Sequence, residues 1–170
     1  TAMGTNIAPT YAQIVMSYLE RAPLHNNPFM YYNRYMDDII AMFRNKASAL
    51  KFIEGYNNAC PSIQLDPASI TIELDHGIIL DLELHVLPDG TLITSVYQKP
   101  LNSYLYIPFT SAHTIGQLKN WILEEIKRYR LYCTRNFDFY TIIILFRKRL
   151  VDRGYTNDFL NPIFTNLPHR

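Results

Sequence analysis

The sequence has little cysteine and no long apolar run, and each shortage excludes a class of protein. Its 170 residues include two cysteines, Cys60 and Cys133, whose spacing fits neither a disulfide framework nor a zinc motif. Two such thiols fit a reducing, intracellular compartment. No stretch approaches the roughly 18 apolar residues of a membrane span, and no secretory signal peptide is recognisable. We therefore expect a protein without a membrane partner.

Net charge is also small, at +1, but it is unevenly distributed along the chain. Residues 1–110 hold six Lys and Arg against ten Asp and Glu, a net charge of −4. Residues 111–170 hold ten against five, a net charge of +5. An acidic part that binds metal beside a basic part that binds phosphate is typical of enzymes acting on polyphosphates. An ordinary solvated surface is the alternative explanation.

The most informative stretch is Tyr35-Met36-Asp37-Asp38, which lies between two apolar segments. Residues 29–34 and 39–43 are rich in aromatic and β-branched side chains, as strands are. The sequence therefore predicts a β-hairpin with two adjacent carboxylates at its turn. Adjacent carboxylates repel each other, and a divalent cation such as Mg²⁺ relieves that repulsion. Taken alone the dipeptide fits a plain turn better, because aspartate is a common turn residue.

Hydrophobic periodicity and end signals predict the remaining elements. Thr114 and Gln117 form a capping box, and Gly154 is suited to ending a helix. Strand-like alternation occupies residues 70–75, and a turn signal at Pro88-Asp89-Gly90 predicts a hairpin over residues 78–97. The expected helices span residues 11–20, 45–59, 114–130, 138–153 and 157–164, with a turn-rich connector at 21–28.

Three blocks stand in an order and spacing that resemble the rear half of a reverse transcriptase palm. The first is Ala2–Pro9 before a helix, the second is Tyr35–Asp38, and the third combines Leu80–Glu83 with Tyr97–Pro100. They are similar to palm motifs B, C and E. Within that superfamily the likeness is to Penelope-like retroelement enzymes, which are related to telomerase. The likeness extends to Tyr104–His113. At the end of this segment the family usually has His-Pro, whereas this chain has His113-Thr114.

The resemblance implies an α+β fold: a right-hand polymerase palm, with helices on one face of an antiparallel sheet, at 1–110 and a small helical thumb at 111–170. The implied activity is RNA-directed DNA polymerisation by two Mg²⁺ ions, with an RNA template and a DNA primer as partners. Asp37 and Asp38 would be the catalytic metal ligands. The family analogy implies the nucleus, with an organelle as the alternative. The residues that would contact nucleic acid or nucleotide are Ala2, Met3, Gly4, Tyr35, Met36, Lys99, Arg147, Lys148 and Arg149.

One departure from the family bears on activity. Palm polymerases hold their metals with a third aspartate from motif A, which together with the fingers would precede Thr1. A second chain could supply both. The alternative is a catalytically inactive remnant that serves as a structural or RNA-binding subunit of a larger assembly. An unrelated α+β domain with chance motifs is a third possibility.

We expect the isolated chain neither to extend a primed RNA template nor to bind Mg²⁺ tightly, because two carboxylates cannot enclose two Mg²⁺ ions. A primer-extension assay with the wild type and Asp37→Asn checks this. Extension by the isolated wild type that disappears in Asp37→Asn would contradict the expectation. Extension restored by an added N-terminal fragment would support a split enzyme.

Overall fold

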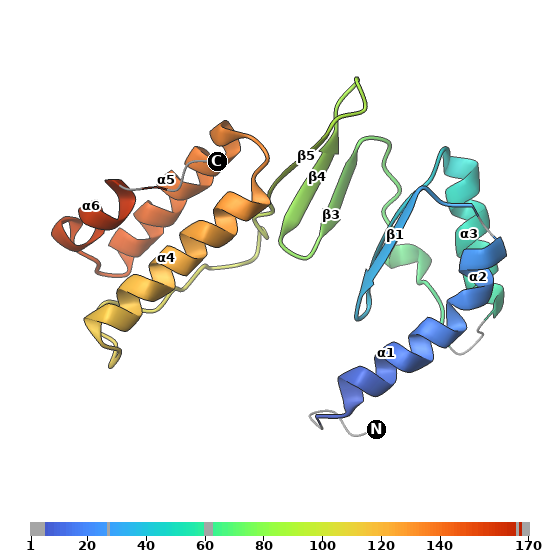
Figure 1. Cartoon of the computed structure of the whole chain (residues 1–170), viewed down its shortest axis with the longest axis horizontal. Coiled ribbons are helices and arrows are strands. Elements are labelled where there is room, and N and C mark those ends of the chain that lie inside the picture. The colour runs from blue at the N-terminus through green and yellow to red at the C-terminus, as the bar shows by residue number, and fades with distance from the viewer. Residues whose placement is uncertain (1–5, 27, 60–62, 166, 168–170) are drawn as a thin grey trace. The chain divides into compact units, whose positions relative to one another are not determined.

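The computed structural model describes residues 6–26, 28–59, 63–165 and 167 of the chain. It divides into two compact units, one ending at Ile79 and the other beginning at Leu80. Both helices and antiparallel strands are present (Figure 1). The chain is therefore an α+β protein, as the sequence predicts.

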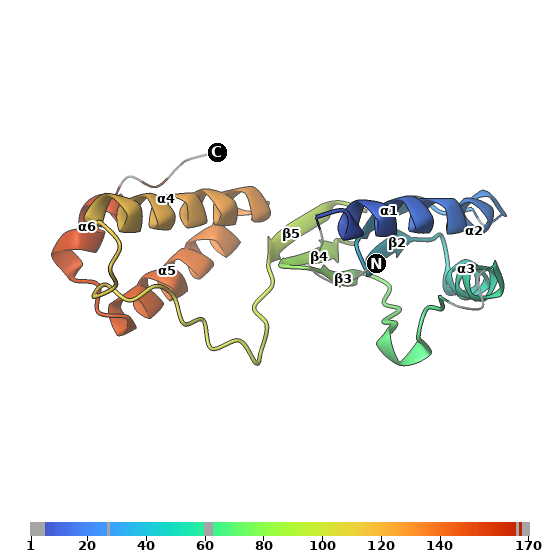
Figure 2. The same ribbon diagram turned by 90° about the horizontal axis from the view of Figure 1, so that it is seen from below.

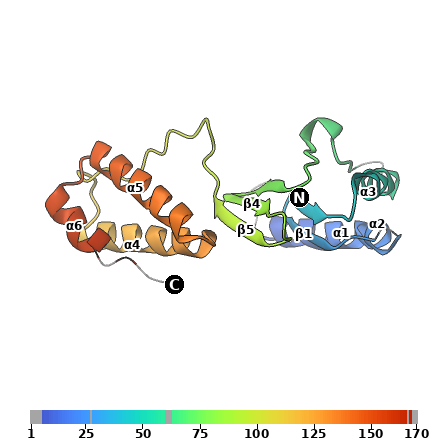
Figure 3. The same cartoon turned by 90° about the horizontal axis from the view of Figure 1, so that it is seen from above.

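The first unit begins with two helices that follow each other almost in line (Figure 3). Pro9 lies in the first turn of α1, where its missing N–H costs nothing. The elements of the unit are α1 (Ala8–Leu19), α2 (Arg21–Asn26), β1 (Tyr31–Tyr35), β2 (Asp38–Met42), α3 (Lys46–Ala59), a short 3₁₀ turn (Pro67–Ser69) and β3 (His76–Ile79).

Two expectations for this unit are wrong. The predicted connector at 21–28 contains α2, which accommodates Pro23 because a proline in the first turn lacks only an unused donor. The predicted strand at 70–75 is irregular, and Leu74 is 93% exposed, whereas β3 begins only at His76. Period-two alternation marks a strand only where one face is buried, and here Ile70 and Ile72 are only half-buried while Leu74 is exposed.

The core of the first unit forms on one face of α3. Ala49, Phe52 and Tyr56 are buried, as the helical periodicity of residues 45–59 implies. The ring of Phe52 lies 6.0 Å from that of Tyr32 on β1 and 5.2 Å from that of Phe43 after β2. These aromatic contacts attach the β1–β2 hairpin to α3.

Glu20, directly after α1, is a charged residue that the unit buries to 4% exposure. Its Oε1 accepts hydrogen bonds from the Tyr32 hydroxyl at 2.6 Å and from Arg34 Nε at 2.5 Å. The Tyr56 hydroxyl on α3 lies 3.5 Å from the same oxygen. One carboxylate thus links α1, β1 and α3. Burial needs such partners, because removing one side of a buried ion pair commonly costs about 3–5 kcal/mol.

The second unit combines a hairpin with three helices (Figures 1 and 2). Leu82 pairs with Val96 and Val86 with Leu92, so the predicted hairpin is confirmed. Gly90 at its turn has φ +84°, a conformation that glycine adopts without strain. The elements are β4 (Leu82–Val86), β5 (Leu92–Val96), α4 (Ile115–Tyr132), α5 (Asn136–Asp152) and α6 (Asn157–Thr165).

The end signals of these helices are as predicted. Thr114 accepts a hydrogen bond from the Gln117 backbone N–H while the Gln117 side chain accepts one from that of Thr114, so the capping box is present. Gly154 has φ +88° and follows the last turn of α5, where the Tyr155 N–H bonds back to the Leu150 carbonyl at 3.1 Å. The segment at 141–146, whose composition also suits a strand, is helical.

Aromatic rings converge on Phe146 of α5, whose side chain is fully buried. The rings of Tyr106, Tyr129 and Trp121 lie 5.1, 5.4 and 5.9 Å from it. The ring of Phe164 on α6 lies 6.1 Å away. Edge-on and tilted arrangements of this kind favour ring pairs beyond the area that they bury. The three helices therefore share one core.

Threonine contacts attach the hairpin to the helices. Thr94 on β5 donates its N–H to Thr134 Oγ1 at 3.0 Å and its hydroxyl to the Tyr132 carbonyl at 2.7 Å. The Thr134 N–H in turn donates to the Thr94 carbonyl at 2.9 Å. The hairpin thus belongs to the same compact unit as the helices, although the sequence groups it with the palm. The predicted functional division at residue 110 stays a prediction.

Along the described part of the chain, no helix combines the length and apolarity that crossing a membrane requires.

Replacing Phe146 by alanine should lower the free energy of unfolding by about 3–5 kcal/mol, because it empties the centre of the core. The matched control is Phe137→Ala on the same helix, whose side chain is 75% exposed and whose loss should change stability by about 0.5 kcal/mol or less. Urea titration of both variants measures the difference. Equal destabilisation would show that Phe146 is not at the centre of the core.

Candidate metal and nucleic-acid sites

The two central aspartates lie where the sequence predicts them. β1 and β2 pair antiparallel with Tyr35 opposite Asp38, which leaves a two-residue loop of Met36 and Asp37. Met36 has φ +55°, a conformation typical of the first loop position in tight hairpins. Asp37 therefore lies in the turn of a short hairpin, and Asp38 follows it as the first residue of β2.

Both carboxylates are exposed, and among the described residues neither forms a side-chain hydrogen bond or an ion pair. Two adjacent negative charges without a cationic partner favour binding of a divalent cation. Their oxygen donors suit Mg²⁺, which commonly takes one or two carboxylates and keeps several waters. The residues thus fit one part of a magnesium site. Among the residues that the structure describes, no histidine, cysteine or further carboxylate lies close enough to join Asp37 and Asp38 as a third metal ligand.

The neighbours of the pair are also accessible. Tyr35 and Met36 are 58% and 40% exposed. Gln13 of α1 donates its side-chain N–H to the Met36 sulfur at 3.4 Å. Ala2, Met3 and Gly4, predicted to lie near the nascent base pair, fall outside the described residues.

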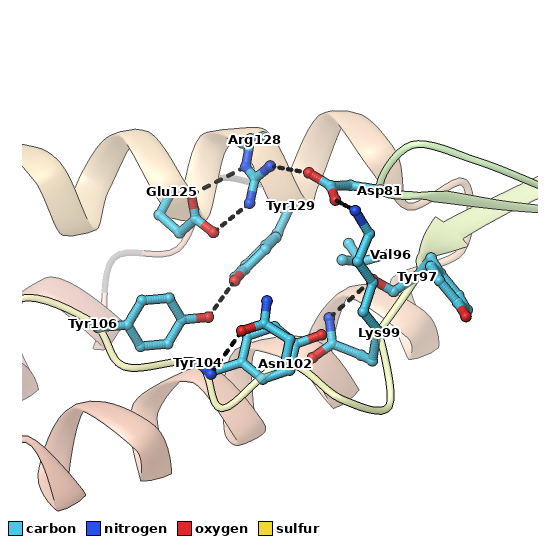
Figure 4. Close-up of a pocket in the computed structure, with 11 residues that line it drawn as sticks. Asp81, Val96, Tyr97, Lys99, Asn102, Tyr104, Tyr106, Glu125, Arg128 and Tyr129 are labelled. Carbon is cyan, nitrogen blue, oxygen red and sulfur yellow. Dashed lines mark hydrogen bonds and ion pairs between the residues drawn. The ribbon is translucent and has the colours of Figure 1, made fainter. Parts of the chain in front are cut away.

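Lys99 borders a polar cavity of about 130 Å³ in the second unit (Figure 4). Its Nζ lies 3.9 Å from Asp81 Oδ1, while Asp81 Oδ2 accepts from Arg128 of α4 at 2.9 Å. Arg128 also binds Glu125 through two nitrogens, at 2.7 and 3.0 Å. Sequence spacing gave no sign of the Asp81–Arg128 pair, because the two residues lie 47 positions apart.

Tyr106 and Tyr129 line another side of this cavity, and their hydroxyl oxygens lie 3.0 Å apart. Burial raises the pKa of Tyr129, and hydrogen bonding with Tyr106 and Glu125 raises it further. The phenol therefore stays protonated and remains a donor. Because Asp81 and Glu125 offset the charge of Arg128 and Lys99, the cavity is not a strong phosphate site.

Arg147, Lys148 and Arg149, three consecutive cations near the end of α5, have different surroundings. Arg147 donates from one nitrogen to the side-chain oxygens of Asn157 and Asn161 on α6, at 2.8 and 3.0 Å. Arg149 donates to the Gln98 side chain at 2.7 Å, and its guanidinium lies 3.6 Å from the centre of the Tyr104 ring.

Lys148 is exposed and, within the described part of the chain, forms no hydrogen bond or ion pair. Consecutive helical residues are about 100° apart around the axis, so the three cations cannot share one face.

Residues 105–165 match the family model of the animal helix-turn-helix domain. No curated protein and no solved structure shows significant similarity to the chain. The match covers α4, α5 and α6, and four residues containing Gly154 join α5 to α6, as in helix-turn-helix units generally. This motif was not among the sequence predictions, although Gly154 between two predicted helices was a usable signal.

Helix-turn-helix units that bind DNA place their second helix in the major groove. Here that helix would be α6, which contains no Lys or Arg and has Asp158 in its first turn. Its Asn157 and Asn161 already accept hydrogen bonds from Arg147. Cations that meet phosphates would therefore have to come from the other helices, where Lys119 and Lys148 are exposed.

Lys148→Ala and Arg149→Ala separate a surface cation from a structural one. Arg149→Ala should lower the free energy of unfolding by about 1–2 kcal/mol, because it removes a charged hydrogen bond and a stacked ring contact. Lys148→Ala should change stability by about 0.5 kcal/mol or less. It should instead flatten the salt dependence of duplex binding, by about 0.9 in the log–log slope if one phosphate contact is lost.

Urea titration and a salt series of duplex-binding measurements check the two expectations. A Lys148→Ala variant that binds duplex with an unchanged salt slope would remove Lys148 from the interface.

Proposed function

We propose that this chain is the C-terminal part of a reverse transcriptase domain, with residues 1–110 as palm and 111–170 as a thumb-like region. The observation that carries the proposal is the tip of the β1–β2 hairpin. There Asp37 and Asp38 stand adjacent, exposed and without an intramolecular cation in the described part of the chain. A plain turn would not require two unneutralised carboxylates on a rigid hairpin.

In the proposed reaction the hairpin residues bind and orient. Asp37 and Asp38 would hold Mg²⁺, with Asp37 the more direct ligand, and a motif A aspartate from outside this chain would complete the site. When bound, two Mg²⁺ ions would stabilise the negative charge that develops on the attacking and leaving oxygens. Tyr35 and Met36 would support the DNA primer end against the RNA template.

The second unit would hold the duplex by its backbone. The match to a helix-turn-helix domain supports nucleic-acid binding of some kind, and the exposed Lys119 and Lys148 offer phosphate contacts. Such contacts position a duplex without reading its sequence. The proposed partners are therefore an RNA template and a DNA primer, in a reducing compartment such as the nucleus.

A second candidate is a catalytically inactive remnant that binds RNA or supports a larger assembly. It is favoured by one observation: within the described ranges, no third metal-ligating group joins Asp37 and Asp38. The two candidates differ at the hairpin tip, because a remnant has no need to bind a divalent cation there.

Manganese binding distinguishes the candidates, because Mn²⁺ replaces Mg²⁺ and broadens the NMR signals of nearby amides. In the ¹⁵N-labelled chain, Mn²⁺ should broaden the amide signals of residues 36–38 first. Asp37→Asn and Asp38→Asn should each weaken this broadening by about tenfold or more, because a ligand charge is lost.

The matched control is Asp89→Asn, at the turn of the other hairpin. Asparagine can keep the hydrogen bond that the Asp89 side chain accepts from the Thr91 N–H. This variant should leave the broadening at residues 36–38 unchanged. Uniform broadening across the chain in the wild type would favour the remnant.

A further inference from the structure

Arg34 of β1 joins a buried carboxylate to the turn that carries the aspartates. Its side chain is 6% exposed. Its Nε donates to Glu20 Oε1 at 2.5 Å, while its Nη1 donates to the backbone carbonyl of Met36 at 2.8 Å. The guanidinium can serve both acceptors at once because its donors are fixed in a planar fork.

The carbonyl that Arg34 binds belongs to a strained position. Met36 has φ +55°, a conformation that is unfavourable for an L-residue other than glycine. The same peptide unit contributes the N–H of Asp37, so a fixed Met36 carbonyl also fixes the orientation of the Asp37 backbone. That orientation decides where the Asp37 carboxylate points.

Glu20 in turn fixes Arg34. Glu20 is 4% exposed, and its Oε1 also accepts the Tyr32 hydroxyl at 2.6 Å. Burial raises the pKa of Tyr32, and the hydrogen bond to Glu20 raises it further, so the hydroxyl remains a donor. One oxygen of the carboxylate, Oε1, therefore accepts from both Tyr32 and Arg34, which restricts the placement of the Arg34 guanidinium.

We infer that Glu20 and Arg34 are positioning residues for the hairpin tip. They hold the Met36–Asp37 peptide in one orientation, so that the carboxylates of Asp37 and Asp38 are presented together to a divalent cation. The inference rests on the metal site of the proposed function. Tight hairpins usually obtain a positive φ from glycine or asparagine, whereas this one places methionine there and binds its carbonyl through an arginine.

Arg34→Lys tests the inference, because lysine keeps the charge next to Glu20 but lacks the planar fork that reaches Met36. We expect the folded chain to persist while the turn loses order. The heteronuclear NOE of the Met36, Asp37 and Asp38 amides should fall, and Mn²⁺ affinity at the tip should weaken by about tenfold, as for other residues that orient metal ligands.

The matched control is Arg44→Lys. Arg44 lies just after β2, is exposed, and forms no hydrogen bond or ion pair within the described part of the chain. This variant should keep the order and the Mn²⁺ affinity of the wild type. Arg34→Lys with wild-type order and affinity at the tip would overturn the inference.

A rescue variant separates positioning from general stability. Adding Met36→Gly to Arg34→Lys should restore order at residues 37 and 38, because glycine adopts a positive φ without needing the arginine bond. If Arg34 mattered only for stability, the glycine would not restore that order, and the inference would be wrong. Should Arg34→Lys fail to fold, Glu20→Gln with and without Met36→Gly provides the same comparison.

The two readouts keep the proposals apart. Loss of turn order in Arg34→Lys supports the positioning role even if the wild type binds no Mn²⁺ at the tip. In that case the metal site, and with it the proposed function, would fail separately.

Discussion

The first unit depends on one buried charge. Glu20 directly follows α1, and its carboxylate is shielded from water, so it must be neutralised and hydrogen-bonded by the protein. Arg34 and Tyr32 of β1 meet that demand, and Tyr56 of α3 lies close to the same oxygen. The requirement fixes the hairpin relative to both helices. Arg34 carries the constraint on to the turn of the hairpin, where the two exposed carboxylates lie.

The second unit is organised by aromatic packing instead. Phe146 lies at the centre, and rings from α4, α6 and the segment before α4 surround it. Several of the charged groups of this unit bind one another, as Arg128 does with Asp81 and Glu125. A positive net charge therefore overstates the number of cations free to meet phosphate. Lys148 is accessible, whereas Arg149 is bound to the surface of its own unit.

These features give the two proposed roles different physical requirements. A metal site needs ligands held in one orientation, and the buried Glu20–Arg34 pair is suited to that because a buried ion pair resists movement. Backbone binding to a duplex needs only accessible charge, which exposed lysines provide without precise placement. The match to a helix-turn-helix domain is relevant to nucleic-acid binding. It does not include the β1–β2 hairpin, on which the proposed metal site depends.

Local patterns were enough to predict α1, α3, α4, α5 and α6, the Asp37–Asp38 hairpin and the capping box at Thr114, because periodicity, turn chemistry and end signals act over a few residues. They did not predict the short helix α2. They misjudged residues 70–75, since alternation cannot say whether a strand face is buried. Tertiary structure alone decided which polar side chains meet. Glu20 with Arg34 and Asp81 with Arg128 are far apart in sequence, and only folding brings their charges together. Tertiary structure also gave Arg147 and Arg149 different partners, on α6 and at Gln98, because successive positions on a helix face different neighbours.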